Sequence, residues 1–330
     1  MQLNTPEIQR LTLAIGALVA LVWKERRGVI PGGVVVPGGL VNLMLLSIPW
    51  GMAILPLALG VHAIYTGWLA SVKHQRLQAM YILGILSVLL SAPVAWIYLQ
   101  AGLLPWSLDS VTGTLLPGVI GFNMQRQKIR PVLSSLIFVS AITAGLTGTV
   151  VLAGTWLLNL NFDSLNPYYL HASDLQIKWH LLQALSTLSV GALIYRRTGM
   201  RPGGYVLAPT AAILLLDPLS AGMLAAGCFA VQTALRKLIK HSLIVGLNRY
   251  VASMLLSIAF VWGTELLFIR LGLEQLPFQG NHLLVILAIL SYANDAILAG
   301  ARRVLPWMLL MIGTSLCVLL LTRLLIVPLD

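Results

Sequence analysis

Residues 25–38 read ERRGVIPGGVVVPG, and residues 196–209 read RRTGMRPGGYVLAP. The two stretches share glycine and proline positions at a constant shift of 171 residues, which is about half of the 330-residue chain. The sequence therefore predicts a duplicated unit, with a first repeat over residues 1–165 and a second, more degenerate repeat over residues 166–330. The recurring positions are Gly28, Pro31, Gly32 and Gly33 in the first copy, and Gly199, Pro202, Gly203 and Gly204 in the second.

The composition around this repeat is that of a membrane protein. The chain is 58% hydrophobic and only 9% charged, with a mean hydropathy of +0.89, whereas soluble domains carry about 25% charged residues. Several apolar runs exceed the roughly 20 residues that cross a bilayer. They are Pro49–Ala70, Leu77–Leu104, Val132–Leu160 and Val304–Val327, with shorter runs at Leu11–Trp23 and Leu181–Tyr195.

The net charge of +11 does not indicate nucleic-acid binding, because the basic residues lie between apolar runs. A bias of Lys and Arg toward the cytoplasmic loops explains this pattern. The connections between the basic clusters are poor in Lys and Arg, so we expect them outside, together with both chain termini. The basic clusters are Lys24–Arg27, Lys73–Arg76, Arg126–Arg130, Arg196–Arg201, Arg236–Arg249 and Arg302–Arg303.

These assignments predict an all-α, polytopic helical membrane protein with about six membrane segments per repeat and about twelve in all. An even number per repeat makes the two repeats parallel. The stretch Ile30–Ala70 begins and ends on the basic side. It is either a hairpin bent near Pro49-Trp50-Gly51 or a re-entrant loop followed by an interfacial helix. The second repeat is expected to bend near Asp217-Pro218.

The first copy resembles a known family, the PgsC/CapC membrane subunit of bacterial poly-γ-glutamate synthesis. The family signature E-x-x-G-[IV]-[IV]-P-x-G-x-V-V-P-G is met from Glu25 to Gly38. A second signature, P-G-L-I-A-N-x-x-Q-x-Q, is partly met from Pro117-Gly118 to Gln127, with Phe122 at the asparagine position and Asn123 one place later. The second repeat keeps Ala293-Asn294 but lacks this Pro-Gly pair. Familiar members are about half as long, so the chain resembles two such subunits fused.

The resemblance implies a place in a complex of the bacterial inner membrane. The expected partners are membrane lipid, a PgsB/CapB-like ATP-dependent ligase and a PgsA/CapA-like outward-facing protein, with a homo-oligomer left open. It implies no cofactor and no catalytic residue in this chain. The sequence shows no metal-ligand spacing and no phosphate-binding loop. Two alternatives stay open: an independent secondary transporter of a small anionic solute, and a structural membrane anchor for the ligase.

Glycine and proline interrupt helices, and irregular backbone at membrane depth is tolerated only where protein or water covers it. One interpretation is a polymer path or re-entrant element, and the other is a bend that lets helices pack closely. The candidate residues are Gly28, Pro31, Gly32, Gly33, Pro37, Gly38, Pro117, Gly118, Gly199, Pro202, Gly203 and Gly204.

The basic clusters also have two interpretations. They either contact a polyanion or an acidic partner surface, or only orient the chain in the membrane. Arginine is favoured for a carboxylate ligand because its planar fork binds two oxygens at once. The candidate residues are Arg26, Arg27, Arg76, Arg126, Lys128, Arg130, Arg196 and Arg197.

Overall fold

The computed structural model of the chain is mainly helical over its described residues, which are 5–69, 76–104, 113–158, 174–199, 206–215, 217–242, 244–273, 276–278 and 282–326. The helices fall into two compact units, Met1–His171 and Ala172–Asp330. Each unit contains six of the described α-helices. The predicted helical membrane fold is confirmed.

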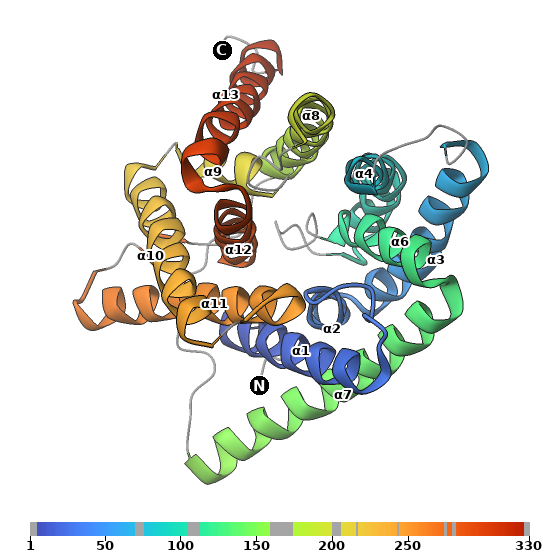
Figure 1. The fold of residues 1–330 in the computed structure, drawn as a ribbon, viewed down its shortest axis with the longest axis vertical. Coiled ribbons are helices and arrows are strands. Elements are labelled where there is room, and N and C mark those ends of the chain that lie inside the picture. Colours follow the sequence, from blue (N-terminus) through green and yellow to red (C-terminus); the bar gives the residue numbers. More distant parts are fainter. Residues whose placement is uncertain are drawn as a thin grey trace. The chain divides into compact units, whose positions relative to one another are not determined.

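The first unit is built from long helices around two short ones (Figure 1). The long helices flank the short ones, and α1 lies alongside α7 while α4 packs against α6. A short π-helical segment, η1, continues α3. The bounds are α1 Pro6–Arg27, α2 Val36–Leu46, α3 Ile48–Ile64, η1 Tyr65–Leu69, α4 Arg76–Gln100, α6 Leu116–Gln127 and α7 Ile129–Leu158.

Local sequence signals set the ends of α1. The Thr5 hydroxyl accepts a hydrogen bond from the Ile8 amide at 3.4 Å, and Pro6 occupies the first helical turn, where its missing N–H costs nothing. At the other end Gly28 adopts a φ of 71°, and its amide donates to the Lys24 carbonyl at 2.8 Å. Glycine ends the helix here because it enters the left-handed region without steric cost.

The two short helices begin against the sides of long helices and not at their ends. A Cβ added to Gly16, near the middle of α1, would lie 2.6 Å from the Gly38 nitrogen, so α2 starts against the centre of α1. A Cβ added to Gly118 would lie 2.7 Å from the Leu83 carbonyl oxygen within α4. Both short helices therefore start with a Pro-Gly pair whose glycine lets two backbones approach closely.

From these contacts α2 and α6 run to opposite ends of the first unit. The α2 helix ends at Ser47, whose hydroxyl donates to the Leu103 carbonyl, just beyond the end of α4, at 2.6 Å. The α6 helix ends at Gln127, which bonds to Ile30, just beyond the end of α1. An 11-residue helix such as α2 is about 17 Å long, too short to cross about 30 Å of hydrocarbon alone.

These contacts decide between the two models for Ile30–Ala70. Because α2 reaches the end where α4 terminates, and α3 returns from there, the segment is a hairpin bent at Ser47. The Ser47 hydroxyl also accepts from the Trp50 amide at 3.4 Å, which caps α3. The second predicted bend is also present, since α9 (Leu207–Leu214) ends and α10 (Pro218–Ser242) begins around Asp217.

The first unit has an internal regularity. The group α1–α2–α3 and the group α4–α6–α7 make equivalent contacts: α1 packs on α2 and α7, and α4 packs on α6 and α3. Likewise α2 contacts α3 and α7, while α6 contacts α7 and α3. Because each group has three segments and α2 and α6 run oppositely, the groups are related as an inverted pair.

The second unit repeats the contact pattern of the first. With α8 in the place of α1 and α13 in the place of α7, every helix pair that packs in one unit packs in the other. In Figure 1, α13 lies beside α8, as α7 lies beside α1. The remaining bounds are α8 Asp174–Thr198, α11 Gly246–Arg270, α12 His282–Ala299 and α13 Ala301–Ile326.

The fourth and fifth helices show where the units agree and differ. Gly102 after α4 and Gly272 after α11 have the same φ of 69°, and the next amide in each case bonds back five residues, Leu103 to Tyr98 and Leu273 to Phe268. By contrast α12 has 18 residues and α6 has 12. The second repeat lacks the Pro-Gly pair, so nothing breaks the helix there.

Eight of the described helices are long and apolar enough to cross a membrane. Four belong to the first unit, and the shorter apolar helix α2 lies in the same unit. Each unit has six described helices, of which α2 and α6 in the first unit and α9 in the second are too short to cross a membrane alone. The outer side of α7 is apolar, with Ile137, Phe138 and Leu146 exposed, as a lipid-facing surface requires.

Candidate functional site

The irregular segment 28–35 between α1 and α2 is held by two polar side chains of α6. The Ile30 amide donates to Gln127 Oε1 at 2.8 Å, and Gln127 Nε2 donates to the Ile30 carbonyl at 3.4 Å. One turn earlier, Asn123 Nδ2 donates to the Gly32 carbonyl at 2.8 Å. Asn123 and Gln127 thereby satisfy backbone groups that no helix pairs. We call these two side chains the clamp. They join the segment that carries the first sequence signature to the helix that carries the second.

Within the clamped segment the glycines have specific backbone roles. Gly32 and Gly33 have φ values of 70° and 132°, which favour glycine. Pro31 and Gly32 are buried, Gly33 is half-buried and Gly28 is exposed. A Cβ at Gly33 would lie 3.2 Å from side-chain atoms of Val36 and Val119. The segment is thus packed between α6 and the start of α2.

The Pro-Gly pairs of the short helices lie in close helix contacts. Pro37, Gly38, Pro117 and Gly118 are all buried. The Gly118 amide donates to the Ser87 hydroxyl at 2.8 Å, and that hydroxyl donates to the Thr114 carbonyl at 2.6 Å. In the structure these residues therefore allow helices to pack closely. Their role in a polymer path stays a prediction.

The second unit preserves part of this arrangement. Gly199 ends α8 with a φ of 67°, as Gly28 ends α1. Asn294 is the counterpart of Asn123 and bonds to its own helix at Leu290 O in the same way, at 2.9 Å. Its Oδ1 accepts from Arg249 Nε at 3.1 Å. The predicted positions Pro202, Gly203 and Gly204 lie outside the described residues.

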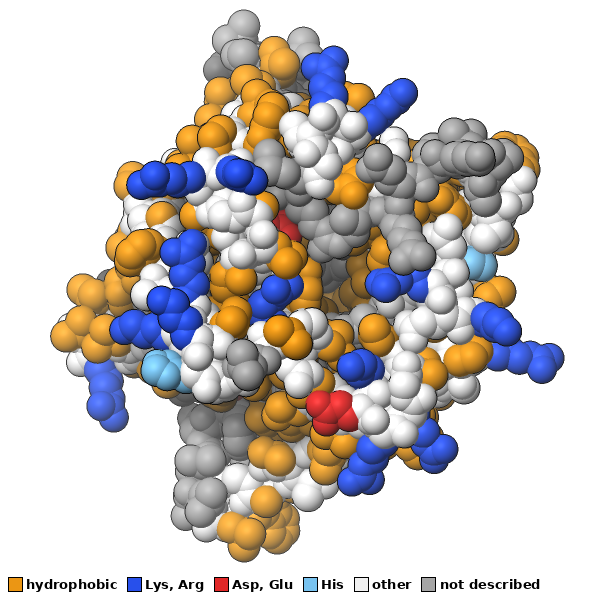
Figure 2. All heavy atoms as spheres, viewed as in Figure 1, with side chains coloured by type: hydrophobic (Ala, Val, Ile, Leu, Met, Phe, Trp, Pro, Cys, Tyr) orange, Lys and Arg blue, Asp and Glu red, His pale blue; other side chains and the backbone are white. Residues whose placement is uncertain are grey.

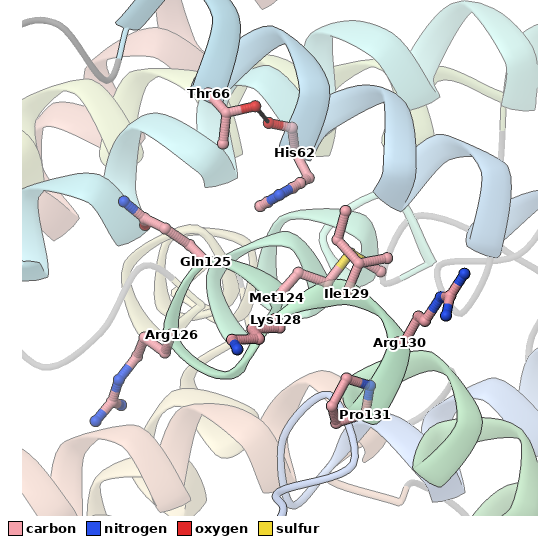
Figure 3. Close-up of a pocket in the computed structure, with 9 residues that line it drawn as sticks. All are labelled: His62, Thr66, Met124, Gln125, Arg126, Lys128, Ile129, Arg130 and Pro131. Carbon is pink, nitrogen blue, oxygen red and sulfur yellow. Dashed lines mark hydrogen bonds between the residues drawn. The ribbon is translucent and has the colours of Figure 1, made fainter.

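An open pocket of about 880 Å³ lies beside the clamp, between the α3–η1 junction and the α6–α7 junction (Figure 3). His62 and Thr66 line it from one side, and residues 124–126 and 128–131 line it from the other, including Arg126, Lys128 and Arg130. None of these lining residues is acidic. Figure 3 shows Lys128 between Arg126 and Arg130, whose side chains extend to opposite sides. The pocket is therefore a cationic depression at the end of the first unit that also carries Arg26 and Arg27.

The backbone of Lys128 is unusual. It is the single residue between α6 and α7, with φ 70° and ψ 157°. A non-glycine residue held in such a region costs of the order of 1–3 kcal/mol, and such strain concentrates at functional sites. Lys128 is the only non-glycine residue with positive φ in the described part of the chain.

The side facing Lys128 has an irregularity of its own. The α3 helix continues as the π-helical segment Tyr65–Leu69, an arrangement that is common at functional sites. Thr66 Oγ1 donates to the His62 carbonyl at 2.9 Å. The buried Nδ1 atom of His62 has no hydrogen-bond partner. The pocket is thus lined by two departures from regular helix geometry.

The remaining predicted cations are only partly brought together. Arg26, Arg27, Arg196 and Arg197 are exposed at helix ends, and Arg27 Cζ lies 5.7 Å from the centre of the Trp23 ring. Arg126 stacks similarly over Phe122 at 5.6 Å. The side chain of Arg76 lies outside the described ones. On the face drawn in Figure 2, basic side chains far outnumber acidic ones.

Two charged residues of α1 are buried although they precede the apolar run Leu11–Trp23. Glu7 is 2% exposed and Arg10 is 0% exposed. The signal that could have found them is the Thr5-Pro6 helix start, which puts both residues inside α1, three positions apart on one face. Within the described residues, no group of three or more His, Cys, Asp or Glu side chains could hold a metal ion.

Comparison with known families places this geometry in context. A family model described as capsule biosynthesis CapC matches residues 15–133 and residues 187–296. The first stretch contains the clamp and every residue that lines the pocket. No curated protein and no solved structure matched the chain. Since the family model matches well over half of the chain, once in each unit, the chain belongs to the CapC family of capsule biosynthesis proteins.

Proposed function

We propose that this chain is the integral membrane subunit of a complex that makes and exports poly-γ-glutamate, an anionic capsule polymer. It handles the polymer beside an ATP-dependent ligase of the PgsB/CapB type and an outward-facing protein of the PgsA/CapA type. It lies in the bacterial inner membrane with both termini outside. The observation that carries the proposal is a cationic pocket inside the family-matched part of a membrane protein.

The physical argument concerns the charge of the polymer. Each unit of a γ-linked glutamate chain carries one free carboxylate, so the product must pass a bilayer while keeping its negative charges solvated or paired. Arginine and lysine side chains at the pocket attract such a chain and supply charge-assisted hydrogen bonds. The Lys and Arg bias of cytoplasmic loops supports placing this pocket on the side of the ligase.

Deletion of the chain from its host is the direct test. We expect γ-linked glutamate polymer to be lost while the ligase protein is still made, and a plasmid copy of the full chain to restore the polymer. The host ligase measured by immunoblot is the control for indirect loss. Unchanged polymer yield in the deletion strain would contradict the proposed function.

The second candidate function is transport of a small anionic solute without a ligase. It is favoured by the inverted three-segment groups with broken helices, an organisation that secondary transporters share. Purified chain in vesicles would then drive gradient-dependent uptake of an anion such as glutamate. Uptake by the chain alone supports this candidate, and vesicles without uptake leave the synthase subunit as the better proposal.

We further propose that the chain arose as a tandem fusion of two family units, one for each repeat. The shared glycine positions, the shared helix pairings and the two stretches of the family match support this. In this arrangement a single fused chain takes the place of two separate subunits.

A further inference from the structure

The junction between α6 and α7 differs between the units in a way that packing does not explain. In both units a single residue with positive φ joins the two helices: Lys128 with φ 70° in the first, and Gly300 with φ 86° in the second. Glycine adopts this conformation without strain, whereas lysine does not. The first unit therefore keeps a long cationic side chain where the second unit has the residue that fits the backbone best.

The residues beside this junction also make the first unit more basic than the second. Counted from the junction residues Lys128 and Gly300, Arg126 two residues before corresponds to the apolar Leu298, and Arg130 two residues after corresponds to Arg302. On the opposite wall, only the first unit shows a π-helical segment among the described residues. The arginine after the junction is therefore common to both units. Among the described residues, the other features of the pocket, which are Arg126, Lys128 and the π-helical segment, occur only in the first unit.

We propose that Lys128, with His62 on the facing wall and Arg126 and Arg130 adding positive charge on either side, is the centre of an oxyanion-binding site that belongs to the first unit alone. Its ligand is a carboxylate of an acidic polymer chain, and the phosphate of an anionic lipid has the same chemistry. The choice of the polymer rests on the proposed function, whereas the existence of the site does not.

The chemistry of the lining supports an anionic ligand. Arg126, Lys128 and Arg130 are exposed at the pocket, no lining residue is acidic, and the buried His62 Nδ1 has no partner. An oxyanion accepts hydrogen bonds from guanidinium and ammonium groups, and such bonds are stronger than those between neutral groups. The strained backbone fixes where the stem of Lys128 leaves the junction.

The test is direct binding to the purified full-length chain in a neutral detergent, with a short γ-linked glutamate oligomer as the probe. We expect Lys128→Gly to weaken binding about tenfold or more, because one charge-assisted contact is lost. The same variant should keep or raise the melting temperature, because glycine relieves the positive φ. Lys128→Ala should lose binding without that gain, and Lys128→Arg should retain binding.

Arg302→Ala is the matched control, because it removes the corresponding arginine of the second unit. It should leave binding unchanged. Equal binding by the wild type and Lys128→Gly, or an equal loss in Arg302→Ala, would overturn the proposal. A lower melting temperature in Lys128→Gly would also overturn it, since Lys128 would then be structural.

A lipid arm distinguishes the two sources of the oxyanion. The wild type and Lys128→Gly are placed in nanodiscs of phosphatidylcholine with and without phosphatidylglycerol, and retained lipid is measured by mass spectrometry. If only the wild type retains phosphatidylglycerol and neither protein binds the oligomer in detergent, the ligand of the site is lipid phosphate. The polymer is then excluded as its ligand. Neither ligand bound means that there is no site. Polymer production in cells is measured separately, so loss of the site is distinguishable from loss of the proposed function.

Discussion

At the scale of single residues, adjacent glycines of α2 have different surroundings. A Cβ at Gly38 would lie 2.8 Å from both Leu13 Cα and Thr12 O of α1, whereas a Cβ at Gly39 would meet the Leu116 side chain at an ordinary 3.5 Å. We expect Gly38→Ala to destabilise the protein by about 1–3 kcal/mol, because backbone atoms of α1 must move. The melting temperature of the chain in detergent measures this effect.

Gly39→Ala is the matched control for this prediction. It adds the same methyl group one position along the same helix, in space that accepts it. Alanine also has the higher helix propensity, by roughly 0.5–1 kcal/mol. We therefore expect an unchanged or slightly higher melting temperature. Equal destabilisation by the two substitutions would mean that the approach of α1 and α2 is looser than these distances indicate.

The clamp on segment 28–35 gives a second prediction. Gln127→Leu removes the acceptor of the Ile30 amide and leaves a partly buried donor unpaired, at a cost of about 1–3 kcal/mol. We expect faster hydrogen exchange at the Ile30 amide, by about tenfold for a loss of 1.4 kcal/mol. Gln127→Glu retains a side-chain oxygen that can accept this bond, so it should keep most of the protection. Unchanged exchange in Gln127→Leu would contradict the clamp.

Sequence reasoning identified most of the residues in this region but not what they do. It marked Gly28 through Gly38 and the cations around Lys128 from composition and resemblance. It treated Asn123 as a signature residue in the wrong place, because contacts across 91 residues, such as Asn123 to Gly32, leave no local pattern. The strain at Lys128 was equally hidden, since a lysine after a helix is ordinary in sequence.

At the scale of elements, the start of α10 depends on Asp217. Its carboxylate oxygens accept from the Leu219 and Ser220 amides, each at 3.2 Å, and its Oδ2 also lies against the Ser220 hydroxyl. That hydroxyl is within reach of the Pro277 carbonyl as well. The hydrogen bond from the Ser220 hydroxyl, followed by those from the two amides, lowers the pKa of Asp217 below 3.8, against the opposing effect of burial.

We expect Asp217→Ala to lose about 1 kcal/mol of stability at pH 7, as for other helix caps. Asp217→Asn should lose less, because its oxygen still caps. Since the folded pKa is lowered, the contribution of the carboxylate is present above the unfolded pKa of about 3.9 and is lost as the pH falls through the folded pKa. The difference in melting temperature between wild type and Asp217→Asn should therefore shrink below about pH 4. A difference that grows on acidification would contradict the cap.

Element boundaries were predictable where proline or glycine set them. The bends near Pro49 and Asp217-Pro218 were expected and are present, because proline tolerates the first turn of a helix and disrupts its interior. The length of α6 was not expected. Residues 111–124 are mostly apolar and suggest one continuous crossing, but α6 begins only at Leu116 and packs its Pro117-Gly118 pair on α4. Hydropathy measures polarity along the chain and not where a helix breaks.

At the scale of the whole molecule, two levels of repetition are combined. The 171-residue repeat is visible in the sequence because the glycine and proline positions persist. The inverted relation between α1–α2–α3 and α4–α6–α7 is visible only in the packing. Apart from the Pro-Gly pairs at Pro37-Gly38 and Pro117-Gly118, the two groups share little sequence pattern. Positions related by the inversion lie at opposite membrane surfaces. Because Lys and Arg are favoured only at the cytoplasmic surface, such positions need not carry similar residues.

These two levels predict which ends of the units face the same side of the membrane. Leu103 and Leu273 follow the corresponding helices α4 and α11, and both are exposed. We expect Leu103→Cys and Leu273→Cys, each in a Cys228→Ser, Cys317→Ser background, to react with a membrane-impermeant maleimide in intact cells. Gln125→Cys and His241→Cys, beside the basic clusters, should react only after permeabilisation, because Lys- and Arg-rich ends face the cytoplasm.

The labelling of residues 103 and 273 answers two separate questions. One is whether the two repeats are parallel, and the other is which side of the membrane the basic pocket faces. If residues 103 and 273 label from the same side, the two repeats are parallel, as six segments per unit require. If they label from opposite sides, an odd number of crossings separates residues 103 and 273 between α6 and α11, and the two repeats are antiparallel. If both label only from the cytoplasm, the repeats are still parallel but the basic pocket faces outward. A ligase at the cytoplasmic surface could then not deliver polymer to it.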